Sequence, residues 1–477
     1  SAVERIEIVD GARLGLPGLS GKVANVIVRS SRVTVQYHYD AQFRRNIQDQ
    51  LTTGGVSASG RLGGTDFTLS LSNDGGLRRG GVGPEFVTAA DGSAILRRDE
   101  RVSFHIDEPR LAGSLHRDFA DGSVANLTLA AGLYIDRTRF RGLVTPADGS
   151  ALYDEFFLQT EDEWNIEGNA DYEFDLGGGR LKLIGLQRYE HSPTTSTFTA
   201  IDRPPGTQAD GVAFDRVADE GESVLRAEYH FGGTGREWQL AVESAYNFID
   251  VTSELATRRA DGSFAAVPLP GGVSFVDEWR GEAQLTRGWT LARGLTLQTS
   301  IGGEYSKLTQ TGANGLSRNF IRPKGLVALA WTASPRLTIN ASIERRVGQL
   351  NFFDFIAAVD VQNDNLNGAN VRLVPSQSWR AEGEIIRSLG TAGSITLGGY
   401  GEWISDIVDR IPLSPTVEGV GNLPSARRFG VTGRGTLLFD GLGWRGARLN
   451  ANVEFRHSSV RDPVTGESRR ISGDLIR

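Results

Sequence analysis

Hydrophobic and polar residues alternate along most of this chain with a period of two. In residues 237–250, EWQLAVESAYNFID, one phase is apolar and the other is polar. A β-strand sends successive side chains to opposite faces, so this alternation predicts a strand with one apolar and one polar face. The same pattern recurs in RLTINASIER at 336–345 and in RLNANVEFR at 448–456.

Short and long connections alternate between the predicted strands. Glycine-rich short turns are typical of β-hairpins, because glycine tolerates a positive φ. They occur at 61–66, 119–123, 175–180, 232–237, 332–336, 390–393 and 440–446, and long polar connections occur at 74–107, 192–220 and 348–375. Short turns facing the periplasm and long loops facing outward are typical of an outer-membrane barrel. We therefore predict an all-β protein, a transmembrane antiparallel up-and-down β-barrel, with about 18 strands of about 10 residues each.

Hydropathy agrees with this fold class. The mean hydropathy is -0.25, and no run of about 18 apolar residues indicates a transmembrane helix. A lipid-facing strand alternates with lumen-facing positions, so its average hydropathy is ordinary and a membrane barrel stays possible. The chain also contains 60 glycines, which disfavour helices by about 1 kcal/mol each relative to alanine.

Aromatic residues gather near the ends of the predicted strands, as in the interfacial girdles of membrane barrels. Aromatic packing in a soluble β-sandwich core is the alternative, and the charges on the opposite face favour the girdle. The residues concerned are Trp279, Trp289, Tyr305, Trp331, Trp379, Tyr400 and Trp403.

Composition excludes several kinds of chemistry. Cysteine is absent, which excludes disulfides, thiolate metal sites and thiol nucleophiles. The net charge of -7 argues against a general nucleic-acid binder. Six histidines lack metal-ligand spacing, and Gly441, Gly443 and Gly446 match a dinucleotide fingerprint that a strand follows where a helix is required. We expect no enzymatic activity, no cofactor and no metal site.

The first thirty residues differ from the rest of the chain. Two β-prone arms, VERIEIV and VANVIVRS, flank a glycine-rich stretch that closes with Ser20-Gly21. This segment resembles the end of the plug domain of TonB-dependent outer-membrane receptors, which finishes with a "VERIEVIRGP" strand, a glycine-rich turn and a "GGVINIITK" strand. Asp10 and Ala12 depart from that pattern. The signature positions retained here include Glu4, Arg5, Glu7, Gly11, Gly21, Asn25 and Arg29.

A second segment resembles the same family. Such receptors often carry "NPxLKPExSxxxExG" where a long outer loop re-enters the barrel. In residues 370–382, NVRLVPSQSWRAE, the spacing of Leu373, Pro375, Ser378 and Glu382 is kept, and Ser376 replaces the acid. The two segments occur in the family's order and are flanked by barrel hairpins.

The resemblance implies a barrel of 22 strands closed by a plug. On this basis residues 1–30 are expected to be the C-terminal remnant of the plug domain and residues 31–477 a barrel that is incomplete at its C-terminus. Most of the plug and the TonB box would precede Ser1, which agrees with the absence of methionine at position 1.

The implied function is TonB-dependent active transport of a scarce nutrient, such as a siderophore, cobalamin or a saccharide, across the Gram-negative outer membrane. The implied partners are outer-membrane lipid, a TonB-type energy-transducing complex and a small-molecule nutrient, and the implied state is a monomer without nucleic acid. A passive porin, or a secreted soluble β-rich binding protein, is the alternative. The opening hairpin favours the plugged receptor over the porin.

Two groups of residues are candidates for a role in transport. Mixed charges on the predicted inward phases suit a hydrated lumen wall, namely Arg226, Glu228, Arg280, Glu282, Arg380 and Glu382. The long connection 348–375 contains a possible ligand-contact group, whose members could equally pack within the loop: Phe352, Phe353, Asp354, Phe355 and Asp360.

Overall fold

The computed structural model describes most of the chain, and nearly all of the described residues are β-strand. These residues are 3–10, 22–28, 33–43, 49–76, 80–89, 91–150, 152–203, 209–233, 236–269, 271–311, 315–356, 358–360, 365–414 and 417–474. In the described ranges, four short 3-10 turns lie between or after the strands: η1 (Phe352–Phe355), η2 (Gly390–Ala392), η3 (Asp440–Leu442) and η4 (Ser472–Asp474). No helix among the described residues has the length and apolar character needed to cross a membrane.

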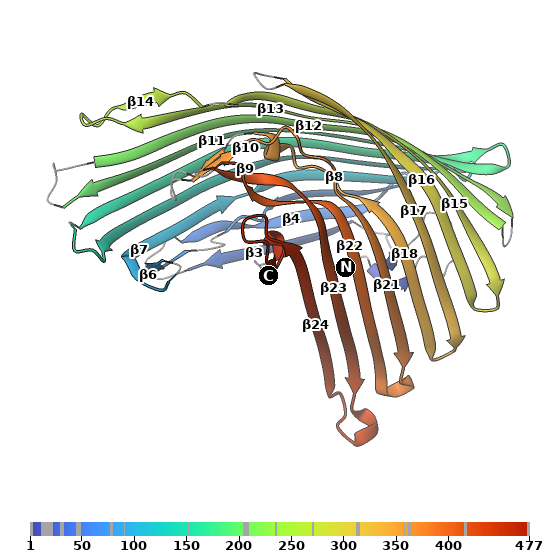
Figure 1. Cartoon of the computed structure of the whole chain (residues 1–477). Helices are drawn as coiled ribbons and strands as arrows, with labels where there is room; N and C mark the ends of the chain where they lie inside the picture. Colours follow the sequence, from blue (N-terminus) through green and yellow to red (C-terminus); the bar gives the residue numbers. More distant parts are fainter. Residues whose placement is uncertain are drawn as a thin grey trace.

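The main architecture is one antiparallel ladder that curves into a barrel-like wall (Figure 1). Among the described residues, seventeen strands lie side by side in it, which confirms the predicted all-β up-and-down fold and is close to the predicted 18. In spatial order they are β3 (Thr34–Gln42), β4 (Gln50–Leu62), β5 (Thr65–Asn73), β8 (Pro109–Asp118), β9 (Val124–Pro146), β10 (Tyr153–Leu176), β11 (Gly179–Asp202), β12 (Ala209–Gly233), β13 (Arg236–Arg258), β15 (Val273–Ala292), β16 (Leu295–Gln310), β17 (Leu316–Ser334), β18 (Leu337–Val347), β21 (Gln377–Ser388), β22 (Gly393–Pro412), β23 (Glu418–Leu438) and β24 (Arg448–Arg461).

The two ends of this ladder are β3 and β24. Among the described residues no hydrogen-bonded register joins β3 to β24 or to the short strand β25 (Ser468–Arg469). Side chains of both β3 and β24 are largely exposed, including Tyr37 and Val453. The wall therefore keeps an open seam at this position.

Two of the predicted long loops are in fact strands. Residues 74–107 contain β6 (Gly80–Thr88) and β7 (Ala94–Asp107), which extend the wall along the outer half of β9. In 192–220, β11 continues to Asp202 and β12 begins at Ala209. Strands here are up to 25 residues long, well beyond the roughly 10 that a membrane needs. The alternation is weaker in these extensions because neither face is buried in lipid.

The short turns lie where the sequence predicts them. Gly177 and Gly178, between β10 and β11, have φ values of 55° and 82°, which a two-residue hairpin turn requires. The connection 348–375 is also confirmed as the long link between β18 and β21, and it contains η1, β19 (Ala358–Asp360) and β20 (Asn365–Gly368). A further short strand, β14 (Phe264–Val267), pairs with the end of β13.

The outer face of the wall carries two rows of aromatic side chains. The upper row, nearer the long loops, has rings in contact from β10 to β15, and the lower row lies near the short turns. Trp279 and Trp289 are ten residues apart on β15, which is about 33 Å along a strand and about 25 Å along the membrane normal at a tilt of about 40°. That distance matches the apolar band of a membrane barrel. The upper row contains Trp164, Tyr189, Tyr246, Phe248 and Trp279, and the lower row contains Phe174, Phe231, Trp238 and Trp289.

Most of the predicted girdle residues face outward, and Tyr400 is an exception. Trp279, Trp331 and Trp403 are each at least 44% exposed on the apolar face. Tyr400 instead lies in register with Glu382, and the guanidinium of Arg380 stacks on its ring at 4.0 Å. The prediction for Tyr400 was wrong because proximity to a strand end does not determine which face a side chain is on. Tyr400 lies two residues from Glu402 on β22, so the two side chains share the inner face.

The opening segment forms a hairpin of its own. β1 (Val3–Asp10) pairs antiparallel with β2 (Lys22–Val28), and together they make a two-stranded sheet separate from the wall. The backbone therefore confirms the two predicted arms. Glu4, Arg5, Glu7 and Asn25 lie on these strands, their side chains lie outside the described ones, and Gly11, Gly21 and Arg29 lie outside the described residues. The plug assignment stays a prediction.

Candidate transport path

The inner face of the wall is lined by charged side chains that pair across neighbouring strands. Arg226 on β12 contacts Glu228 at 2.6 Å and Glu243 on β13 at 3.2 Å, and Glu243 also contacts Arg280 on β15 at 3.2 Å. These side chains share the strand phase opposite to that of Trp238 and Trp279, so they line the concave side.

The same network continues toward β17. Lys324 lies between two carboxylates, with its Nζ 2.6 Å from Glu282 Oε2 and 2.7 Å from Glu304 Oε2. On β21, Arg380 contacts Glu382 at 3.0 Å. All six charges predicted for the lumen wall therefore lie on the inner face in opposite-charge pairs. Such a wall is polar and hydrated, yet its charges largely compensate one another.

The connection between β18 and β21 packs its apolar side chains against this inner face. Phe355 of η1 is 1% exposed and Leu373 is fully buried. Both belong to one hydrophobic cluster with wall residues from five consecutive ladder strands, β12 to β17: Ala218, Ile249, Val251, Val276, Leu308 and Phe320. We call residues 348–376 the inner loop.

Hydrogen bonds from the wall fix the backbone of the inner loop. Gln310 Nε2 donates to the carbonyl of Phe355 at 3.0 Å, and Arg318 Nη1 donates to the carbonyl of Leu373 at 2.9 Å. Within the loop, the amide of Asn370 donates to the carbonyl of Asp354 at 3.1 Å. Both halves of the loop are thus tied to the wall and to each other.

Asn422 on β23 holds the point where the loop re-enters the wall. Its Oδ1 accepts from the amide of Val374 at 2.9 Å, and its Nδ2 donates to the carbonyl of Val374 at 2.9 Å. Nδ2 also donates to the carbonyl of Asp406 at 2.6 Å. Asp406 has a φ of 54°, a strained value for a residue with a side chain. One amide side chain therefore holds both the loop and the strained backbone at Asp406.

The predicted ligand-contact group divides in the structure. Phe355 is a packing anchor, whereas Phe352 and Phe353 are half-buried, and the guanidinium of Arg216 lies 5.1 Å from the Phe353 ring. Burial raises the pKa of the Asp354 carboxyl. Asp360 belongs to β19 by its backbone, and its side chain lies outside the described ones. Phe352, Phe353 and Asp354 remain candidates for contact with a ligand.

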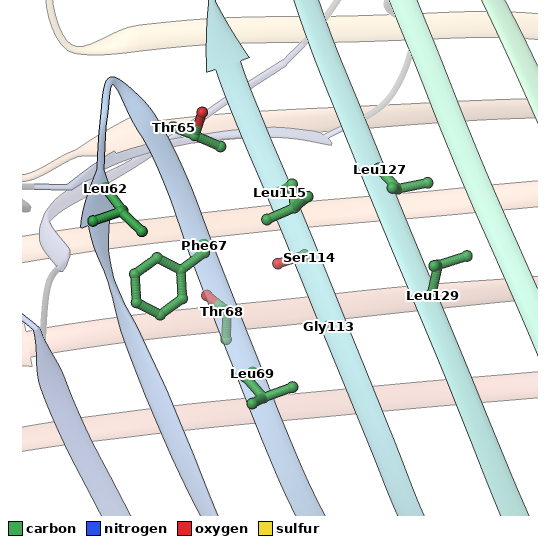
Figure 2. A pocket seen from close by; sticks show the side chains of 10 residues that line it. All are labelled: Leu62, Thr65, Phe67, Thr68, Leu69, Gly113, Ser114, Leu115, Leu127 and Leu129. Carbon is green, nitrogen blue, oxygen red and sulfur yellow. The ribbon is translucent and has the colours of Figure 1, made fainter.

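One hollow among the described residues is not part of this path. It lies on the outer face over β5, β8 and β9, where Gly113 leaves a gap between Leu69 and Leu129 (Figure 2). Half of its lining residues are leucines, including Leu115 and Leu127. Among the described residues no group of three or more His, Asp or Glu side chains could hold a metal ion.

Comparison with known proteins connects this geometry to solved structures. No family model matches the sequence, and no curated protein sequence matches it. Solved structures do match. The alcaligin outer-membrane receptor FauA from Bordetella pertussis has a TM-score of 0.51 and 14% identity, over 98% of this chain and 69% of that one.

The chain has the fold of an outer-membrane receptor barrel. Two further receptor-fold structures agree. The siderophore receptor PiuA from Acinetobacter baumannii has a TM-score of 0.52 and 11% identity, with 98% of this chain and 71% of that one covered. The copper transporter OprC has a TM-score of 0.55 and 11% identity, with 98% and 68% covered.

Sequence reasoning missed the residues that hold the inner loop in the receptor fold. Arg318 and Asn422 lie on strands distant in sequence from the loop, and single-strand patterns do not reveal such pairings. A signal was present in the loop itself. Leu373 and Ser378 of the family-like motif are both buried, and Ser378 Oγ donates to Glu402 Oε1 at 2.9 Å. The motif thus marks where the chain rejoins the wall.

Proposed function

We propose that the chain forms the barrel of a TonB-dependent receptor that imports a small-molecule nutrient across the Gram-negative outer membrane. The observation that carries the proposal is the wall itself. Its outer face has aromatic rows at membrane spacing, and its inner face has paired charges. The fold likeness to outer-membrane receptors supports it, as does the resemblance of residues 3–29 to the end of a plug domain.

Transport in this proposal is gating without bond chemistry. Ligand binds at the outer end, where Phe352, Phe353 and Asp354 of the inner loop offer aromatic and acidic contacts. An energy-transducing complex then pulls on the plug, and a path opens along the lumen. Paired charges such as Arg226 with Glu243 compensate each other, which lowers the electrostatic cost of the plug sliding past the wall.

The substrate class comes from the comparisons, as a proposal. The similar structures are named for alcaligin, for a siderophore and for copper. Ferric siderophores and copper are therefore the first nutrients to test, ahead of cobalamin and saccharides.

The test is energy-dependent uptake by cells that produce the natural protein. Labelled ferric siderophore or copper should accumulate, and a protonophore should abolish the accumulation. Deleting residues 351–370 should remove it while leaving the protein in the outer-membrane fraction. Uptake that the protonophore leaves unchanged would identify a passive porin. A protein recovered in the soluble fraction without detergent would identify a secreted β-rich binding protein.

A further inference from the structure

A cluster of arginines stands on the outer face of the wall above the upper aromatic row. Arg139 and Arg141 on β9 and Arg101 on β7 are all exposed. On β9 the opposite phase is buried and contains Phe140 and Val144. The arginine phase is that of Leu129, which lines the outer hollow (Figure 2). We call Arg101, Arg139 and Arg141 the basic patch.

The basic patch lacks compensating charge. Arg101 lies directly opposite Arg141 in the β7–β9 register, and like charges in facing positions destabilise a sheet. The nearby acids on the same face are engaged elsewhere: Asp99 contacts Arg97 at 2.7 Å and Asp162 contacts Arg137 at 2.6 Å. In the part of the chain that the structure describes, no carboxylate forms an ion pair with the patch. An anion that bridges Arg101 and Arg141 would relieve their repulsion.

The height of the patch restricts which anion can reach it. Leu133 on β9 lies in register with Trp164 of the upper aromatic row, and Arg139 and Arg141 follow it by six and eight residues. At about 2.5 Å of height per tilted residue, the patch stands about 15–20 Å above the row. The headgroup layer of an ordinary phospholipid extends only about 5–8 Å beyond the hydrocarbon core.

We propose that the basic patch binds the phosphorylated sugars of an outer-leaflet glycolipid. Guanidinium groups bind phosphate oxygens through paired, charge-assisted hydrogen bonds, so three arginines on adjacent strands suit one or two phosphate groups. The outer hollow below the patch would accept an acyl chain of the same lipid. The proposal rests on the placement in the outer membrane made above.

The experiment measures glycolipid binding to the full chain in detergent micelles by native mass spectrometry. The probe is rough lipopolysaccharide with a phosphorylated sugar core. The test variant is R101Q/R139Q/R141Q. The control, R293Q/R336Q/R445Q, removes the same charge at turns of the opposite end of the wall. Equal thermal unfolding of both variants shows that the fold is intact.

The test variant should bind the probe at least tenfold more weakly, and the control should bind within twofold of the unchanged chain. Removing the core phosphates from the probe should weaken its binding to the unchanged chain by a similar factor. Equal binding by the test variant, or by the phosphate-free probe, would overturn the proposal. Full displacement of the probe by equimolar phosphatidylglycerol, or by millimolar inorganic phosphate, would also overturn it. No transport is involved, so failure here leaves nutrient uptake untouched.

Discussion

Replacing Phe355 with alanine should release the inner loop from the wall. The Phe355 side chain is 1% exposed and packs in the cluster built by β12 to β17. A Phe→Ala change at a buried position costs about 3–5 kcal/mol through lost burial and the cavity that remains. The wall is held by its own hydrogen-bonded ladder. The cost therefore falls on docking of the loop, and 3 kcal/mol raises its undocked fraction roughly a hundredfold.

Hydrogen exchange measures this opening directly. The amides of Gly348, Ile356 and Asn370 donate within the loop or to its re-entry point, so they exchange when the loop undocks. In Phe355→Ala these amides should exchange roughly a hundredfold faster, and amides of the β10–β11 ladder should keep their rates. Phe264→Ala is the control, since Phe264 is 38% exposed on the short strand β14.

Two results would refute the reasoning. Loop exchange within a factor of three of the unchanged chain would mean that the hydrogen bonds from Gln310 and Arg318 hold the loop without the aromatic anchor. Faster exchange throughout the wall would mean that Phe355 stabilises the barrel as a whole. Phe355→Leu keeps most of the side-chain volume. Its loop amides should exchange at rates between those of the unchanged chain and those of Phe355→Ala.

Four further predictions follow from the same contacts. Asn422→Leu removes three hydrogen bonds and should speed exchange of the Val374 amide, for a local loss of about 2–3 kcal/mol, and unchanged exchange would contradict this role. Lys324→Met leaves Glu282 and Glu304 facing each other and should lower stability in micelles by about 2–3 kcal/mol, whereas Lys324→Arg should not. Val242→Arg, midway between Trp238 and Phe248 on the outer face, should cost about 2–4 kcal/mol, and a negligible cost would argue against the lipid band. The pKa of Asp462 is lowered to about 2, first by the amide of Thr465 and then by Arg469 and the amide of Val464. The turn 462–467 should therefore stay ordered above pH 4 and loosen as the pH falls through about 2, and NMR spectra of these amides across that range check the sign.

The wall was predictable because its physics is local. Alternation in 237–250 fixes both faces of β13, and the glycine turns fix most strand ends. The outer extensions of β11 and β12 were missed because Thr-rich segments such as 194–199 lack the alternating apolar positions that indicate a strand. Tyr400 was assigned to the wrong face because only its cross-strand neighbours determine its parity.

The site was less predictable because its contacts join residues that are far apart in the sequence. Phe355 reads equally well as a ligand contact or as core, and only its burial among wall residues separates the two. Asn422 carries no motif at all, and its importance lies in three backbone groups brought to it by β22 and the inner loop. The paired charges of the lumen were predictable as a set, whereas the partner of each was not.

The length of the strands has a consequence for what meets this protein first. β10 begins at Tyr153, eleven residues beyond Trp164 of the upper aromatic row. At about 2.5 Å of height per residue, the rim of the wall stands about 27 Å above the lipid boundary. Molecules arriving from the medium, antibodies and phage tail fibres included, therefore encounter the rim before they encounter the cell's lipid surface.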